Sequence, residues 1–200
     1  LIQIAFIIIT IIANRRGLND AAAVGIVEKV ISFLFLVPSS MLSSVSALGA
    51  QNFGAGKPER AVETLKYAIM IAVGFGLTVA VVIQFAADPV VSLFTDNGTV
   101  IHSGGQYLRG YIWDCVFAGI HFSFSGYFCA CQKSGLSFLH NITAIVLVRV
   151  PGVYMMSRLF SDTLYPMGLA TAAGSLLSVI ICVIVFTILL KKERKNKAFR

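Results

Sequence analysis

An all-helical membrane protein is the fold class that this sequence predicts, and three observations lead to it. Hydrophobic residues make up 57% of the 200 residues, only 12% are charged, and the mean hydropathy is +0.84. Soluble domains carry about 25% charged residues, so a chain of this composition could not cover a large core with a polar surface. Six apolar runs approach the length of about 20 residues that spans a bilayer, and they lack the two-residue alternation of barrel strands. We therefore expect a bundle of six transmembrane helices.

The six expected helices follow one another with short polar connections. The chain opens inside an apolar run, without an initiator methionine or a basic flank, which we interpret as a fragment with a truncated first helix. Residues 88–102 are acidic and polar between two apolar runs, so we expect them to lie at the membrane interface. The predicted spans are residues 1–13, 21–50, 66–87, 105–132, 138–159 and 167–190.

The stretch SALGAQNFGAGKPERA, residues 46–61, brings glycines and a lysine together as phosphate-binding loops do. A Walker loop needs Gly, four residues and then Gly-Lys-Ser/Thr, but Gln51 stands at the first glycine position and Pro58 follows Lys57. We expect a turn instead, in which the glycines end the second helix and Pro58 begins the third. The sequence therefore predicts no nucleotide site here.

The distribution of Lys and Arg predicts the orientation. Six of the sixteen basic residues lie in residues 191–200, KKERKNKAFR, which we interpret as a cytoplasmic tail against anionic lipid headgroups and not as a nucleic-acid site. With the tail in the cytoplasm, that side holds ten basic residues near the helix ends and the other side four. Arg15 and Arg16 are exceptions to this pattern. We expect a multi-pass protein of the plasma (inner) membrane with a cytoplasmic carboxyl terminus.

Asp114 is the strongest candidate for a functional residue, because an ionisable side chain inside a membrane span is costly and marks ion or substrate pathways. Tyr107, Tyr111 and His121 lie on the same helical face at spacings of three and four residues. A carboxylate there could hold Na⁺ or a cationic compound, or bind a proton and release them. The alternative is a structural salt bridge, for instance to Arg149.

Two further sites combine charge with unusual local sequence. Glu28 and Lys29 are expected near the outer end of the second span, where snorkelling to the interface or lining of a cavity would accommodate them. Arg149 precedes Pro151 in the fifth span, and we expect the proline to kink that helix. For Arg149, pairing with a buried acid is favoured over a contact with substrate.

The segment from residue 21 to residue 61 resembles the multidrug and toxin extrusion (MATE) family. Pro38 stands in a helix rich in small residues, and Gln51-Asn52 with the GAG sequence at residues 54–56 and Arg60 matches the xQNxGAG turn of that family. LFTDN and SGYFCACQKS, at residues 93–97 and 125–134, also agree with it. The resemblance implies that residues 1–190 are the carboxyl-terminal six-helix lobe of a two-lobe, twelve-helix transporter. It also implies a missing amino-terminal lobe of similar size and, after the lobe, the tail at residues 191–200.

The same resemblance implies a secondary active antiporter that exports drugs or organic cations, amphipathic or cationic, in exchange for Na⁺ or H⁺. No cofactor other than the coupling ion is then needed. Related transporters use an acidic residue with a nearby tyrosine in the helix that holds Asp114. Gln3 lies where the family often places a polar or acidic residue of the cation site, and its amide can coordinate a cation but cannot titrate.

Two alternatives remain. A flippase for lipid-linked oligosaccharides would share the two-lobe architecture, but its cavity needs several buried cations for a pyrophosphate, and these spans hold mainly Lys29 and Arg149. A membrane protein that is not a transporter is the second. An enzyme is not expected, because the chain has no HExxH, no GxSxG and no paired acids, and His121 and His140 lack a second metal ligand one turn away.

Overall fold

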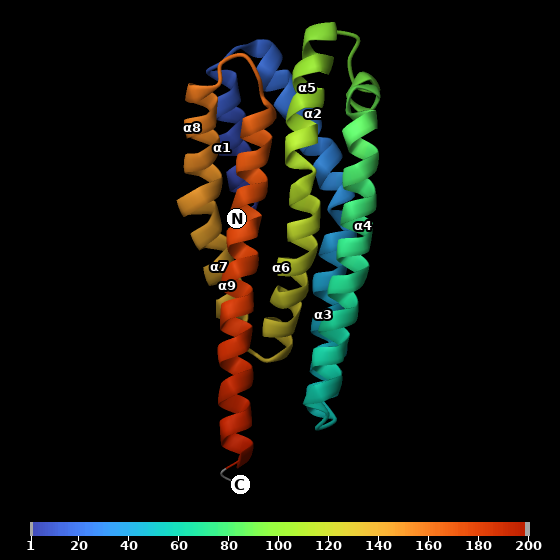
Figure 1. Ribbon diagram of the computed structural model, residues 1–200, viewed down its shortest axis with the longest axis vertical. Helices are drawn as coiled ribbons and strands as arrows, with labels where there is room; N and C mark the ends of the chain where they lie inside the picture. The colour runs from blue at the N-terminus through green and yellow to red at the C-terminus, as the bar shows by residue number, and fades with distance from the viewer. Residues whose placement is uncertain (1, 199–200) are drawn as a thin grey trace.

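The computed structural model describes the backbone of residues 2–198 and the side chains of residues 4–192. In this part of the chain every regular element is helical, and the helices form an elongated bundle (Figure 1). The segments are α1 (Ile2–Asn14), α2 (Leu18–Leu34), α3 (Leu36–Gly54), α4 (Pro58–Ser92), α5 (Gly98–Tyr111), α6 (Trp113–Ala130), α7 (Ser134–Ala144), the π-helical turn η1 (Ile145–Arg149), α8 (Val150–Leu159) and α9 (Tyr165–Ala198).

These segments make six passes along the bundle, which confirms the predicted six-helix architecture. α2 and α3 join at Phe35, α5 and α6 join at Ile112, and α7, η1 and α8 follow one another without a break. Within the described residues, four stretches are long and apolar enough to cross a membrane by length and composition: Leu18–Gly54, Pro58–Ser92, Ser134–Leu159 and Tyr165–Lys192.

The two ends of the bundle differ in what they contain. We call the end that holds the connections at residues 15–17, 93–97 and 160–164 the distal end (upper in Figure 1). The opposite end, with the connections at residues 55–57 and 131–133 and the carboxyl terminus, is the tail end. The backbone of α9 continues as a helix into the predicted tail, and the side chains of the tail after Lys192 lie outside the described residues.

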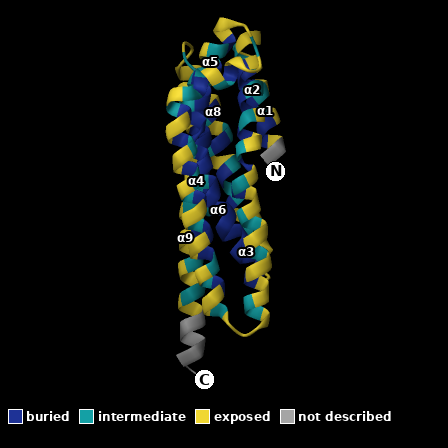
Figure 2. Cartoon of the chain, turned by 90° about the vertical axis from the view of Figure 1, so that its right-hand side faces the viewer, coloured by how far each residue is buried: buried dark blue, intermediate teal, exposed yellow. Residues whose placement is uncertain are grey.

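α6 is the central helix of the bundle and packs against α3, α4 and α9. Small residues allow these close approaches: a Cβ atom added at Gly119 would lie 2.7 Å from Cβ of Ala72 in α4, and one at Gly126 would collide with the carbonyl oxygen of Leu42 in α3. Small residues at helix crossings are typical of membrane bundles. Figure 2 shows the result, with buried residues on the inward faces and exposed residues around the outside.

The outer surface is rich in large apolar side chains. Phe33 is 73% exposed, Phe85 83% and Leu147 65%. Such a surface suits a lipid solvent and would be a liability in water. The burial pattern therefore agrees with the membrane class predicted from composition.

The turn at residues 55–57 has the predicted form. α3 ends at Gly54, α4 begins at Pro58, and Gly56 has a φ of +70°, a conformation that glycine adopts without strain. The glycines and the proline of this stretch therefore have a structural role in the connection.

The interval at residues 88–102 differs from the prediction. α4 continues to Ser92, and α5 already begins at Gly98, so only residues 93–97 connect them. Asn97 caps α5, because its side-chain oxygen accepts hydrogen bonds from the backbone N–H groups of Thr99 (3.0 Å) and Val100 (3.4 Å). Pro89 lies in the last turn of α4, where its missing N–H removes a single helical hydrogen bond.

The fifth pass contains a π-helical turn next to Pro151, where the sequence predicts a kink. The π-helical turn of residues 145–149 directly precedes the first turn of α8, in which Pro151 lies. A π-helical turn contains one more residue than an α-helical turn, and such turns often occur at functional sites. It ends at Arg149, so this local widening sets the direction of the arginine side chain.

Candidate functional site

Asp114 and Arg149 form an ion pair in the interior of the bundle. Asp114 lies in the first turn of α6 and is fully buried, and Arg149 ends the π-helical turn with 5% of its surface exposed. The Nη2 atom of Arg149 donates a hydrogen bond to Oδ2 of Asp114. The pairing that the sequence left as an alternative is therefore the observed arrangement.

This ion pair is incompletely satisfied. Oδ1 of Asp114 and Nε of Arg149 are buried and have no partner of good hydrogen-bond geometry among the described residues, although the Ser175 side chain of α9 lies close enough to interact with the aspartate. Removal of two charges from water is compensated only when further hydrogen bonds satisfy the remaining lone pairs and protons. The pair thus has room for another donor at the aspartate and another acceptor at the arginine.

Tyr107 and Tyr111 border the ion pair from α5. Both rings are fully buried, and their centroids lie 5.5 Å apart in an edge-to-face arrangement. The guanidinium carbon of Arg149 lies 5.8 Å from the centroid of the Tyr111 ring, within range of a cation–π interaction. Neither hydroxyl has a hydrogen-bond partner in the described part of the chain. The helical face predicted from spacing therefore does place both tyrosines close to the charges.

Glu28 lies deeper than the sequence indicated. α2 begins at Leu18, after Gly17 with a φ of 142°, so Glu28 lies ten residues inside the helix and is only 9% exposed. Its Oε2 atom accepts a hydrogen bond from the Thr10 hydroxyl at 3.1 Å, and its Oε1 atom is buried without a partner in the described residues. Snorkelling is therefore wrong for Glu28, and Asp114 is not the only acidic side chain in the interior.

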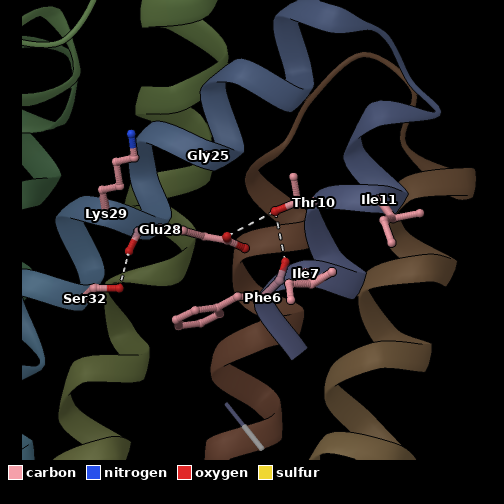
Figure 3. Close-up of a pocket in the computed structure, with 8 residues that line it drawn as sticks. All are labelled: Phe6, Ile7, Thr10, Ile11, Gly25, Glu28, Lys29 and Ser32. Atoms are coloured by element: carbon pink, nitrogen blue, oxygen red, sulfur yellow. Dashed lines mark hydrogen bonds between the residues drawn. The ribbon is translucent and has the colours of Figure 1, made fainter. Parts of the chain in front are cut away.

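A cavity of about 550 Å³ opens between α1 and α2 beside this carboxylate (Figure 3). The close-up shows the Glu28 carboxylate directed toward Thr10 of α1, while the Lys29 side chain is directed away from it. Glu28 also lies within electrostatic range of Arg149, so the cavity and the central ion pair are coupled by charge. The lining residues are Phe6, Ile7, Thr10, Ile11, Gly25, Glu28, Lys29 and Ser32.

His121 and His140 form a second polar cluster nearer the tail end. His121 lies on α6 two turns beyond Asp114, and its ring centroid is 5.7 Å from that of His140 in α7. His140 hydrogen-bonds to Ser125 at 2.9 Å and to Ser178 at 3.2 Å, whereas Nδ1 of His121 has no partner in the described residues. No group of three or more His, Cys, Asp or Glu in the described part of the chain could hold a metal ion.

The sequence predicted a site role for Gln3 of α1 and none for Thr10 of the same helix. Gln3 belongs to α1, but its side chain is outside the described residues, so its predicted place in a cation site stays a prediction. Thr10 was not found from the sequence. Its hydroxyl also lies 2.9 Å from the carbonyl oxygen of Phe6, the common position of a threonine within a helix, and only the fold shows that it faces Glu28.

The unsatisfied polar atoms lie around the central ion pair and, at His121, in the histidine cluster. Each buried atom of this kind that lacks its hydrogen bond costs about 1–3 kcal/mol, and such atoms are rare in native proteins. All of those found in the described side chains belong to residues that the sequence singled out as candidates. They are Glu28 Oε1, Tyr107 Oη, Tyr111 Oη, Asp114 Oδ1, His121 Nδ1 and Arg149 Nε.

Comparisons with known sequences agree on one family. The family model described as MatE matches residues 1–155. The FAD transporter of Shewanella oneidensis is 28% identical over 135 residues, which cover 66% of this chain and 29% of that protein. The probable multidrug resistance protein YoeA of Bacillus subtilis is 24% identical over 119 residues, which cover 60% of this chain and 26% of that protein.

Solved structures show the same fold. Superposition on a crystal structure of MATE in complex with MaL6 gives a TM-score of 0.88 at 18% identity, covering 96% of this chain and 44% of that one. The inward-facing conformation of a multidrug resistance MATE family transporter of the MOP superfamily gives 0.77 at 19% identity, with 96% and 44% coverage. The chain thus spans less than half the length of the proteins it matches, and the match fits one lobe of the two-lobe fold.

Proposed function

Because the chain belongs to the MatE family of membrane transporters, we propose that it forms the carboxyl-terminal lobe of a secondary active antiporter. The antiporter exports amphipathic or cationic compounds in exchange for Na⁺ or H⁺, and an amino-terminal lobe closes the cavity from the other side. The length of the match, 44% of a MATE chain, supports this division. As a transporter lobe the chain performs no covalent chemistry, and the coupling ion takes the place of a cofactor.

The observation that carries the proposal is the set of unsatisfied polar atoms around Asp114, Arg149 and Glu28. A proton or a sodium ion bound at a carboxylate supplies the partner that Oδ1 of Asp114 and Oε1 of Glu28 lack in the present arrangement. A transport site must also release its ion, so a partly satisfied cluster suits the task better than a saturated one.

We propose that Asp114 and Glu28 exchange the charge of Arg149 during the cycle. When Asp114 is ionised, it holds Arg149 and so ties α6 to the fifth pass. A proton or a cation on Asp114 weakens this pair, and the arginine then turns toward Glu28, the other carboxylate within its electrostatic range. The π-helical turn before Pro151 gives the backbone freedom for this change of direction.

The energies involved are of the right size for a gradient to control. Breaking a buried ion pair by removing one partner costs about 3–5 kcal/mol, and moving one charge through 100 mV contributes about 2.3 kcal/mol. A membrane potential combined with a concentration gradient of the coupling ion therefore covers most of the difference between the two arrangements.

The orientation that we propose places the tail end in the cytoplasm of a cell bounded by the plasma membrane. The basic residues at this end support it, because cytoplasmic loops carry an excess of Lys and Arg. The relatives named above differ in the compounds that their names state, so the substrate has to be proposed from the cavity itself.

Transport by the two-lobe protein in proteoliposomes tests the proposal. We expect an imposed pH or sodium gradient to drive efflux of a fluorescent amphipathic dye, and Asp114→Asn to abolish the gradient dependence in the protein that is inserted and folded. Glu63→Gln, at an exposed acid of α4, is the matched control and should transport normally. If efflux by Asp114→Asn still depends on the gradient as in the wild type, Asp114 is not part of the coupling mechanism.

A further inference from the structure

The cavity between α1 and α2 is lined by one acidic and one basic side chain. Glu28 supplies a carboxylate that is anchored by Thr10 through one oxygen and has its other oxygen free. Lys29 supplies an ammonium group that forms no ion pair or hydrogen bond with any described residue. Both line the same cavity.

The helix separates the two charges and leaves each of them available. Adjacent residues of an α-helix point about 100° apart, and Figure 3 accordingly shows the carboxylate directed at α1 and the lysine directed away from it. They therefore do not neutralise each other. Lys29 is exposed, whereas Glu28 is nearly buried, so the negative charge lies deeper and the positive charge lies toward the open side.

The rest of the lining is apolar or weakly polar. Phe6, Ile7 and Ile11 form a hydrophobic wall on the α1 side, and Ser32 lies one turn after Lys29 on α2. A lysine inside a span is costly unless its ammonium reaches water or an anion. Lys29 is exposed at the cavity, where its ammonium group can meet an anionic group of a ligand.

We propose that this cavity selects zwitterionic amphiphiles, compounds that carry a positive and a negative group on an apolar body. The positive group faces Glu28 and the negative group faces Lys29, while the body packs on the wall of Phe6, Ile7 and Ile11. A simple organic cation satisfies Glu28 but brings a like charge close to Lys29 and leaves Lys29 without a partner. Binding sites reject related ligands by such unfavourable charge contacts. This inference rests on the proposed transport function and narrows its substrate class.

Three dyes with one xanthene body test the inference. Tetramethylrhodamine is a zwitterion, its methyl ester is a cation, and fluorescein is an anion at neutral pH. Their affinities for the purified two-lobe protein in lipid nanodiscs are measured by fluorescence anisotropy, with protein-free nanodiscs as the blank. We expect the zwitterion to bind about tenfold more tightly than the other two, as one added charge-assisted contact would produce.

Variants of Lys29 separate charge from shape. In Lys29→Gln the preference for the zwitterion over its methyl ester should fall to near one, and in Lys29→Arg it should persist. Lys57→Gln, at an exposed lysine of the α3–α4 turn, controls for net charge and should leave all three affinities unchanged. Circular dichroism and thermal melting verify that each variant folds.

The outcomes distinguish this inference from the function on which it rests. If folded Lys29→Gln keeps the wild-type preference, or if the methyl ester binds as tightly as the zwitterion, the inference is wrong. The proposed function survives that result provided that Glu28→Gln weakens the binding of the zwitterion and of its methyl ester, the two dyes that carry a positive group. If no dye binds and Glu28→Gln has no effect on dye efflux, the cavity is not a substrate site and both proposals fail.

Discussion

Two arginines in different parts of the bundle show how differently this fold uses the same side chain. Arg16, at the distal end, donates through all three guanidinium nitrogens, and Arg149, in the centre, donates through one and leaves Nε unsatisfied. The saturated arginine fixes a connection, whereas the unsaturated one can change partners. The acceptors of Arg16 are Asp20 Oδ2 (2.8 Å) and the carbonyl oxygens of Ser157 (2.9 Å), Phe160 (2.7 Å), Ser161 (2.7 Å) and Thr163 (3.5 Å).

The contacts of Arg16 also bear on the count of basic residues. Arg15 and Arg16 were exceptions to the predicted orientation. Arg16 ties the connection after α1 to the loop between α8 and α9, so its position follows from the packing of that end. A second distal arginine behaves similarly: Arg109 of α5 forms two hydrogen bonds to the carboxylate of Asp88 in α4, at 3.0 and 3.1 Å.

The largest effect is expected from Arg149→Gln, which leaves Asp114 buried without its counter-charge. We expect the variant to lose transport and about 3–5 kcal/mol of unfolding free energy, as broken buried pairs do. The double variant Asp114→Asn/Arg149→Gln removes both charges and should recover most of the stability without transport. Thermal unfolding in nanodiscs and dye efflux provide the two measurements. If the double variant is no more stable than Arg149→Gln, the stability loss of the single variant does not come from an unpaired charge on Asp114.

Arg16→Gln is expected to lower stability by an intermediate amount and, unlike Arg149→Gln, to leave transport unchanged. Hydrogen bonds from charged donors contribute about 1.5–3 kcal/mol each, but this site is partly exposed, so we expect a net loss of about 2 kcal/mol in stability. The dependence of efflux on pH or sodium should stay as in the wild type. Arg15→Gln, at the exposed neighbouring arginine, is the control and should change neither property. If efflux by Arg16→Gln depends on pH or sodium differently from the wild type, Arg16 also takes part in coupling, and the two arginines do not have different roles.

The sequence was sufficient for those parts of the structure that depend on local pattern. Apolar run lengths gave the six passes, the glycines and Pro58 gave the turn at residues 55–57, and helical spacing placed Tyr107 and Tyr111 beside Asp114. Each of these features depends on residues that are close in the chain.

The features that sequence did not reveal depend on contacts between passes. Hydropathy placed the start of the second helix three residues late, because Asn19 and Asp20 make its first turn polar and an apolar window omits that turn. Glu28 consequently looked interfacial, although Thr10 of another helix holds it in the interior. The sequence also left the pairing of Arg149 with Asp114 as one of two alternatives. The two residues are 35 positions apart, so only the contact between passes shows that they pair.

The smallest effect, and the sharpest test of the contrast, is expected from Tyr111→Phe. The Tyr111 hydroxyl is buried without a partner, so its removal eliminates an unsatisfied group and should leave stability unchanged or raise it by about 1 kcal/mol. Ser125→Ala removes a buried hydroxyl that is hydrogen-bonded to His140 and should lower stability by about 1 kcal/mol. Thermal unfolding of the two variants compares an unsatisfied with a satisfied group at similar depth. Efflux should nonetheless slow in Tyr111→Phe, because the hydroxyl is then missing when Arg149 or the coupling ion needs a donor or acceptor. A Tyr111→Phe protein that is clearly destabilised would show that its hydroxyl already has a partner, and the unsatisfied cluster would then not mark the transport site.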